Sequence, residues 1–303
     1  MGHILITGGT GLLGQAITQL LEQKGYEVAY LSRNKEKSGN IRLYQWDIKS
    51  GFIEEGAIEN ASAIMHLAGA SVADGRWTDA RKKIIIDSRV ESANLLLQKI
   101  KEVGHSPDTL VAASAIGYYG ITTLDKTFTE EDSPASDFLG HVCQLWEQAT
   151  SKFTEHGIRT VQIRIGVVLS NKGGALPQMA QPIKLFAGSP LGTGRQAIPW
   201  IHIHDIANMF VHALENKIEG PFNGVAPNPV DNKSFTKILA GVLKRPLFLP
   251  NVPAFVIKMM LGEQAVIALE GTKVSAKKIE HAGFVFKHPT LEPALKSIYT
   301  LQE

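Results

Sequence analysis

Short apolar runs alternate with longer amphipathic stretches through the first half of the chain. The run His3–Thr7 is apolar at its centre, and from Leu12 to Lys24 apolar residues return with the spacing of a helix. Further strands are predicted at Glu27–Leu31, Ile41–Trp46, Ser62–Leu67, Thr109–Ser114 and Arg159–Ile165. The longest helices are predicted at Asp79–Val103 and Asp137–His156. This alternation favours an α/β fold, with a doubly wound parallel sheet covered by helices on both faces.

The pattern changes after about Ser170. Glycine, proline and short segments dominate as far as Pro199, and residues 222–229 again have the composition of a loop. Helical spacing returns at Ser234–Leu243, Ala254–Leu269 and Leu291–Leu301. We therefore expect a smaller C-terminal region whose elements are partly interleaved with those of the sheet.

Glycines mark the passage from the first strand into the first helix. Gly8 permits a tight turn, Gly11 lets the backbone approach a pyrophosphate, and Gly14 lets the helix pack closely on the strand. The helix that follows offers unpaired N–H groups and the positive end of its dipole to an anion. This strand–turn–helix context favours a dinucleotide-binding turn of the Rossmann type over a purely structural one. The residues expected at the cofactor are Gly8, Thr10, Gly11, Leu12, Leu13 and Gly14.

The end of the second strand indicates which cofactor binds. NAD-selective sites usually place an acidic residue there, to accept hydrogen bonds from the ribose hydroxyls. This chain has Ser32-Arg33-Asn34-Lys35 instead, and hydroxyl and guanidinium donors suit a 2′-phosphate. The pattern favours NADP(H) over NAD(H), with Ser32 and Arg33 as the contacts. A solvated basic loop is the alternative.

Composition narrows the function classes. The 303 residues are 44% hydrophobic, which is ample for a core, and a net charge of +2 argues against nucleic-acid binding. The single cysteine, Cys143, excludes an intrachain disulfide and a cysteine-rich metal site. We see no targeting signal and no apolar run of membrane-spanning length, because Val252–Leu269 is interrupted by charges and glycine. We expect a cytoplasmic monomer or homodimer with a small-molecule substrate and no membrane partner, with an organelle left open.

Several motifs along the chain together resemble a known family. They are Thr7–Gly14, His66–Ser71, Gly75–Trp77, Asp87–Arg89, Ser114–Gly120, Trp200–Asp205, Pro253–Phe255, Leu261–Glu263 and Ala282–Phe284. On these motifs the chain resembles the atypical extended short-chain dehydrogenases/reductases called NAD(P)-dependent epimerase family proteins. Some relatives carry nucleotide-sugar epimerase labels, and others carry cell-division-inhibitor labels. The resemblance covers nearly the whole chain.

The resemblance implies a domain organisation. It implies an NADP-binding Rossmann domain over 1–170 and a mostly substrate-binding region over 171–303. Within the second region, a segment near 199–225 is expected to return to the Rossmann sheet. The family's C-terminal piece falls at about 250–297.

The resemblance also implies further cofactor contacts. Asp47, after the third strand, resembles the acid that accepts from the adenine amino group. Arg164, at the end of the sixth strand, resembles the arginine before the loop that covers the nicotinamide, with a surface salt bridge as the alternative. Leu67, Ala68 and Gly69 resemble the loop beside the cofactor ribose, with a simple strand-to-helix turn as the alternative. Ser88 falls where relatives often place an asparagine that braces the sheet.

The family's usual catalytic residues are absent as a set. That chemistry needs a tyrosine, a lysine four residues later, and a hydroxyl from the fifth strand, and the first two fall at Leu139 and Cys143. The hydroxyl position falls at Ala115, with Ser114 one residue earlier as a candidate. Tyr118 and Tyr119 follow the same strand, where a phenol is able to donate a proton to a carbonyl oxygen.

Other chemistry is weakly supported. Sugar-nucleotide relatives often have an arginine where this chain has Ile198, so a different anion contact is needed. The arginines that could replace it are Arg76, Arg81, Arg89 and Arg195, although Arg81-Lys82-Lys83 has the composition of a solvated helix face. His202 and His204 lack a third ligand at useful spacing, so no metal site is expected.

Two function classes remain. One is an NADP(H)-dependent oxidoreductase or sugar-nucleotide-type epimerase with a non-standard proton donor, and the complete substrate half favours it. The other is a catalytically weak NADP(H)-sensing or regulatory protein, linked to cell division through the labels of some relatives. Fold analogy does not separate them.

The assignment of Arg33 to the 2′-phosphate is testable by cofactor titration. A charge-assisted contact of this kind contributes roughly 1.5–3 kcal/mol. Arg33→Ala is therefore expected to weaken NADPH binding by more than about tenfold. NADH lacks the phosphate and serves as the control, so its affinity should stay nearly unchanged. Equal losses for the two cofactors would contradict the assignment.

Overall fold

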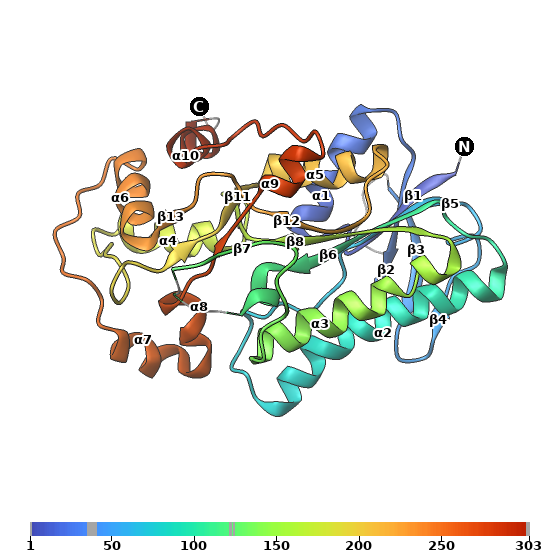
Figure 1. Ribbon diagram of the computed structural model, residues 1–303, viewed down its shortest axis with the longest axis horizontal. Helices are drawn as coiled ribbons and strands as arrows, with labels where there is room; N and C mark the ends of the chain where they lie inside the picture. The colour runs from blue at the N-terminus through green and yellow to red at the C-terminus, as the bar shows by residue number, and fades with distance from the viewer. Residues whose placement is uncertain (1, 35–40, 121–122, 124, 301–303) are drawn as a thin grey trace.

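An eight-stranded sheet forms the centre of the molecule (Figure 1). The computed structural model describes residues 2–34, 41–120, 123 and 125–300. The strand order is β12-β8-β6-β5-β1-β2-β3-β4, and every neighbouring pair is parallel except β3 and β4. Its strands are β1 His3–Thr7, β2 Val28–Ser32, β3 Arg42–Asp47, β4 Phe52–Ile53, β5 Ala61–His66, β6 Thr109–Ala115, β8 Arg159–Ile165 and β12 Gly220–Gly224. The predicted doubly wound α/β fold is confirmed.

Helices cover both faces of this sheet. On one face α1 (Leu12–Gln23) packs beside α5 (Ile203–Glu215), and on the other α2 (Asp79–Val103) packs beside α3 (Phe138–Ser151) (Figure 1). A separate hydrophobic cluster lies on each face, because consecutive strand side chains point to opposite sides. Side chains cap the second pair of helices: Thr78 accepts from the N–H of Arg81, and Asp137 accepts from the N–H of Gly140.

The second half of the chain adds a smaller body at one end of the sheet, at the left of Figure 1. Three two-stranded sheets join it to the rest: β9 Val167–Leu169 with β11 Trp200–His202, β10 Ala197–Ile198 with β13 Val230–Asp231, and β7 Thr127–Phe128 with β14 Lys273–Val274. Its helices are α4 Ala175–Lys184, α6 Asn232–Val242, α7 Ala254–Leu261, α8 Ala265–Leu269 and α10 Leu291–Thr300. Helix α9 (Lys277–His281) instead packs on β12, and its Ile279 belongs to the apolar cluster on the face of the main sheet that α1 and α5 cover. Short 3₁₀ turns complete the set: η1 Ile116–Tyr119, η2 Thr154–His156 and η3 Gly262–Gln264. Helices α4, α6 and α10 enclose a third apolar cluster around Trp200 and Phe235.

The segment 199–225 contributes to both bodies. Strand β11 pairs with β9, outside the main sheet, whereas α5 covers the main sheet and β12 is its edge strand beside β8. The two halves are therefore interleaved rather than joined by one linker.

Four predictions of element bounds are wrong. The loop expected over residues 222–229 overlaps β12, which ends at Gly224. Helix α4 lies in the stretch that we expected to be loop, because Pro182 and the glycines before the helix mask the helical spacing of Leu176, Ala180 and Ile183, all buried. The helix expected over Ala254–Leu269 is divided at Gly262, whose φ of 60° a continuous helix does not allow. The helix expected over Asp137–His156 ends at Ser151 and is followed by the separate turn η2.

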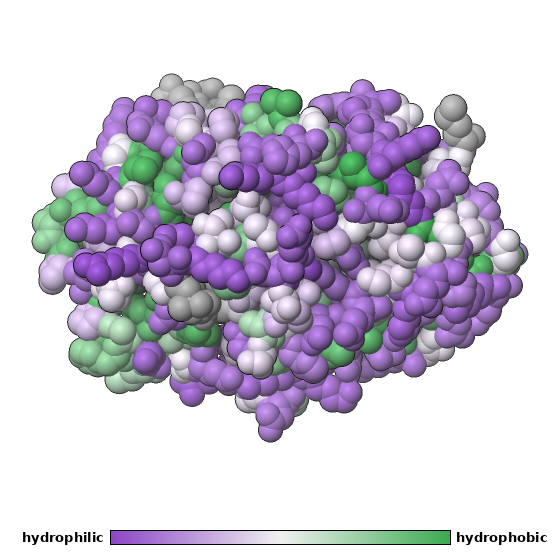
Figure 2. All heavy atoms as spheres, in the orientation of Figure 1, coloured by the Kyte–Doolittle hydropathy of each residue, from purple (hydrophilic) through white to green (hydrophobic). Residues whose placement is uncertain are grey.

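The outer surface is mostly hydrophilic on the face in Figure 2, and apolar side chains gather over α7. Within the described ranges, no helix combines the length and the apolarity needed to cross a bilayer.

Two glycines of the turn differ in how much room they leave for a side chain. A Cβ at Gly14 would lie 2.5 Å from the carbonyl oxygen of Gly8, and both are backbone constrained by β1 and α1. A Cβ at Gly11 would meet only that same oxygen, at 3.2 Å. Gly14 therefore sets the close packing of helix on strand, and Gly11 is open toward the ligand side.

We expect Gly14→Ala to lower the free energy of unfolding by about 1–3 kcal/mol, the usual cost of overpacking a rigid site. Gly11→Ala should unfold close to wild type but lose NADPH affinity. Gly241→Ala, in α6 with open space around it, is the matched control and should be neutral or slightly stabilising. Chemical denaturation measures the three variants, and similar stability of Gly14→Ala and Gly241→Ala would contradict this division.

Candidate functional site

The carboxyl ends of β1, β2, β5, β6 and β8 meet at one edge of the sheet. The chain turns in opposite directions from β1 to β2 and from β5 to β6, so a crevice opens at this edge in such folds. The Gly8–Gly14 turn lies here, closed by a hydrogen bond of 3.0 Å from the N–H of Gly11 to the carbonyl of Gly8. Gly8 has a φ of 72°, and Thr10 and Gly11 are exposed. Because Gly11 is the N-cap of α1, its position offers no side chain to the first N–H groups of that helix.

The sequence-predicted selectivity residues lie at the end of β2. Arg33 is exposed, and the Ser32 hydroxyl bonds within its own turn, to the backbone of Asn34. Lys35, the last residue of that motif, lies outside the described residues. Asp47, at the end of β3, accepts from the N–H of Lys49 and the hydroxyl of Ser50, and these bonds lower its pKa.

The loop after β5 is fixed by hydrogen bonds from two elements. The hydroxyl oxygen of Thr7 accepts from the N–H groups of Leu67 and Ala68, both at 3.1 Å. Two residues of α2 hold Ala70: Arg89 donates to the carbonyl of Ala70, and the Ser88 hydroxyl oxygen accepts from the N–H of Ala70.

A Cβ on Gly69 would lie 3.1 Å from the Arg89 guanidinium carbon, so only glycine leaves room for that side chain. Buried His66, whose pKa burial lowers to about 4, stays neutral at ordinary pH and bonds to Thr7 and Ser92. The loop therefore presents backbone to the crevice in one fixed conformation.

A buried ion pair lies behind the ends of β6 and β8. Arg164 on β8 and Glu147 on α3 make two hydrogen bonds of 2.8 Å, with side chains only 3% and 10% exposed. The Ser114 hydroxyl donates to the same carboxylate at 2.6 Å. Arg164 also donates to the Tyr119 hydroxyl, which in turn donates to the side-chain oxygen of Asn223 on β12. We call these five residues the Glu147–Arg164 network.

The network determines what the three predicted proton donors are able to do. Tyr119 is 2% exposed, its proton is held by Asn223, and burial raises its pKa to about 12. The proton of Ser114 is directed to Glu147. Tyr118 is half-buried, with its ring 3.5 Å from the Arg164 guanidinium, and burial raises its pKa too. Tyr118 meets the network at Arg164, which lies over its ring and donates to its hydroxyl oxygen, so this contact does not engage the proton of the phenol.

Leu139 and Cys143 lie where the resemblance placed the missing catalytic pair. Both project from α3 against η1, since a Cβ on Gly117 would be 3.2 Å from the Cβ of Leu139 and 3.6 Å from the sulfur of Cys143. Burial raises the pKa of the Cys143 thiol to about 12, so it stays protonated and inert. Leu139 packs into an apolar cluster with Trp77, Ile85 and Val142.

Sequence reasoning missed Glu147 and Asn223. Glu147 lies four residues after Cys143, on the buried face of α3, and this spacing is the signal that was available. Asn223 comes from a strand distant in the sequence, so nothing local indicated it. The surface salt bridge considered for Arg164 is wrong, because that side chain is buried.

The charged residues of α2 form no uniform solvated face. Arg81 donates to the carbonyl of Ser71, and Lys82 pairs with Glu263 of η3 at 2.8 Å. Of these three cations, Lys83 is the exposed one, with 74% of its side chain in solvent, and it pairs with Asp87. Lys82 and Arg81 therefore fix the 70–78 loop and η3 against α2.

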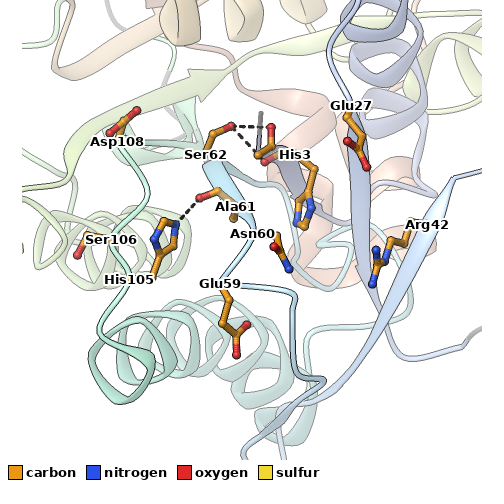
Figure 3. Close-up of a pocket in the computed structure, with 11 residues that line it drawn as sticks. His3, Glu27, Arg42, Glu59, Asn60, Ala61, Ser62, His105, Ser106 and Asp108 are labelled. Atoms are coloured by element: carbon orange, nitrogen blue, oxygen red, sulfur yellow. Dashed lines mark hydrogen bonds between the residues drawn. The ribbon is translucent and has the colours of Figure 1, made fainter.

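A second group of polar residues lies at the opposite edge of the sheet. A hollow of about 530 Å³ lies there, and His3, Ser62 and His105 are among the residues that line it (Figure 3). Two of these bond to nearby backbone: His3 to the carbonyl of Ala57 and His105 to that of Ala61. The hollow lies at the amino ends of β1 and β5, so it is separate from the site at their carboxyl ends. In the described ranges, no group of His, Cys, Asp or Glu has an arrangement suited to a metal ion.

Comparisons with known proteins agree with this fold. Residues 4–225 match the model of the NAD dependent epimerase/dehydratase family, and residues 252–298 match a domain of unknown function. The chain is 42% identical to the epimerase family protein YfhF of Bacillus subtilis, over 98% of this chain and 97% of that protein. It is 36% identical to the epimerase family protein SDR39U1 of Mus musculus, over 98% and 99% of the two chains.

Among solved structures, human SDR39U1 with NADPH superposes with a TM-score of 0.89. The two are 34% identical, over 98% of this chain and 99% of that one. A nucleoside-diphosphate sugar epimerase from Corynebacterium glutamicum is 32% identical, with a TM-score of 0.77, over 97% of this chain and 57% of that one.

The buried ion pair is testable by its effect on stability. Glu147→Gln leaves the Arg164 guanidinium buried without its counter-charge, and breaking such a pair costs roughly 3–5 kcal/mol. Asp87→Asn removes the exposed partner of Lys83 and is the matched control, with an expected loss of no more than about 0.5 kcal/mol. Urea unfolding measures both, and comparable losses in the two variants would show that the buried pair is not special.

Proposed function

Because the chain belongs to the NAD dependent epimerase/dehydratase family, we propose that it is an NADPH-dependent oxidoreductase that reduces the carbonyl group of a small molecule. The observation that carries the proposal is the open glycine turn at Gly11 together with the exposed cation of Arg33 at the end of β2. The NADPH in the human relative supports the same cofactor.

The residues at the crevice fit such a cofactor. The uncapped first turn of α1 and Gly11 would hold the pyrophosphate, and Ser32 with Arg33 would hold the 2′-phosphate. Asp47 would accept from the adenine, and the fixed backbone of Leu67–Gly69 would lie beside the ribose. Arg164 would act from behind β8 through Tyr118, since its own hydrogen bonds go to Glu147 and to the tyrosines of η1. When bound, NADPH supplies a hydride.

Tyr118 is the proton donor in this proposal. Ser114 and Tyr119 direct their protons into the Glu147–Arg164 network, so neither is free to donate to a substrate without breaking a buried hydrogen bond. The raised pKa of Tyr118 keeps its phenol protonated at neutral pH. The protonated phenol is the form that is able to donate to a carbonyl oxygen. The proposed direction is reduction because NADPH is the cofactor that the site is proposed to hold.

A second candidate is a cofactor-sensing protein without turnover. One observation favours it: Leu139, at the place of the family's usual tyrosine, packs among Trp77, Ile85 and Val142. An apolar filling there leaves less room for a polar substrate. The protein would then respond to the NADPH concentration through binding alone. Neither the reductase nor the cofactor-sensing protein would have epimerase activity that depends on the usual tyrosine and lysine.

Substitution of the two tyrosines separates these candidates. NADPH consumption is followed at 340 nm, a wavelength at which the reduced nicotinamide absorbs, against a panel of aldehydes, ketones and sugar nucleotides. We expect Tyr118→Phe to lower kcat by roughly 10²–10⁴, the usual contribution of a positioned acid. Tyr119→Phe is the matched control and should lower the free energy of unfolding while most of the rate is kept. Wild-type rates in both variants would contradict Tyr118 as the donor, and tight NADPH binding without any turnover would favour the sensor.

A further inference from the structure

Large apolar side chains are exposed together at the C-terminal end of the molecule. Six of them, from 44% to 73% exposed, form what we call the apolar patch: Leu185, Phe186, Phe248, Leu249, Phe255 and Met259. Figure 2 shows the corresponding apolar surface over α7 and over the chain between α6 and α7. An exposed group of this size on a globular protein usually marks a contact surface.

The two parts of the chain that carry the patch lie side by side. The segment after α4 runs beside the segment between α6 and α7, because the N–H of Val252 donates to the carbonyl of Pro190 and Leu191 bridges to Val252. The Arg245 guanidinium lies 5.0 Å from the centre of the Phe186 ring. Phe255 and Met259 are one helical turn apart, so they share a face of α7.

The two segments that carry the patch, 184–195 and 244–262, contain positive but no negative side chains. Lys184, Lys244, Arg245 and Lys258 are all exposed. Aspartate and glutamate make up about one residue in ten of the whole chain, yet neither 184–195 nor 244–262 contains one. The surface is therefore both apolar and cationic.

The positive charge around the patch indicates which kind of partner binds it. A symmetric pair of copies of the chain would place the same cations against each other, which opposes association. A bilayer surface with anionic lipids instead attracts each cation and accepts the protruding phenylalanine, leucine and methionine side chains at the headgroup level. We propose that the apolar patch adsorbs to anionic membrane surfaces. Adsorption needs no spanning helix, so the lack of a spanning segment in the sequence does not bear on it.

Vesicle flotation with the full chain tests the proposal. The probes are vesicles of pure phosphatidylcholine and vesicles of phosphatidylcholine mixed with phosphatidylglycerol. We expect binding to the mixed vesicles only, weakened by added salt. The double variant Lys244→Glu/Arg245→Glu should lower the partition coefficient by more than about twentyfold, since each lost cation counts for roughly fivefold. Phe255→Ser/Met259→Ser should lower it by about tenfold or more.

Matched controls lie elsewhere on the surface. Val285→Ser removes an apolar side chain that is 85% exposed outside the patch, and Lys217→Glu reverses an exposed charge outside it. Both should bind vesicles like wild type. The proposal is overturned if wild type ignores the mixed vesicles, if it binds pure phosphatidylcholine equally, or if the controls lose binding as the patch variants do. It is also overturned if sedimentation shows a dimer that Phe255→Ser/Met259→Ser dissociates, because a second copy then covers the patch.

Discussion

The hydrogen-bonded ion pair between Glu147 and Arg164 is the interaction on which the rest of the candidate site depends. Both charges are removed from water, which is costly, and the cost is offset because each charge has several hydrogen-bond partners. The carboxylate accepts from Arg164 and Ser114, and the guanidinium also reaches Tyr119. In this way one pair joins α3, η1 and the strands β6, β8 and β12 behind the carboxyl edge of the sheet.

This constraint has a chemical consequence. A network that satisfies its own donors and acceptors holds their protons inside the protein, so Ser114 and Tyr119 support the architecture of the site. Tyr118 lies on the same turn with its ring against Arg164, and this contact leaves its own proton outside the network. In the proposed function, Tyr118 takes the part of the tyrosine whose place the resemblance assigns to Leu139.

Local patterns in the sequence were sufficient for the sheet and for the glycine turn between β1 and α1. The bounds of α2 and β8 were predicted to the residue, because clear caps or turns flank both elements: Thr78 and Gly104 bound α2, and Gly157 and Gly166 lie on either side of β8. Helix α4 was missed where Pro182 and flanking glycines outweighed its spacing. The partnership of Glu147 with Arg164 was missed for a different reason: a contact between residues seventeen apart on a helix and a strand leaves no periodic trace.

A structure of the protein crystallised with NADPH tests the central claim most directly, since that claim joins cofactor choice to the Glu147–Arg164 network. We expect the 2′-phosphate beside Arg33, the pyrophosphate at Gly11, and the nicotinamide at the end of β6 on the side of Tyr118, with the network unchanged. A 2′-phosphate directed away from Arg33 into solvent would contradict the account. So would a nicotinamide kept from the end of β6 by Leu139 and its apolar neighbours.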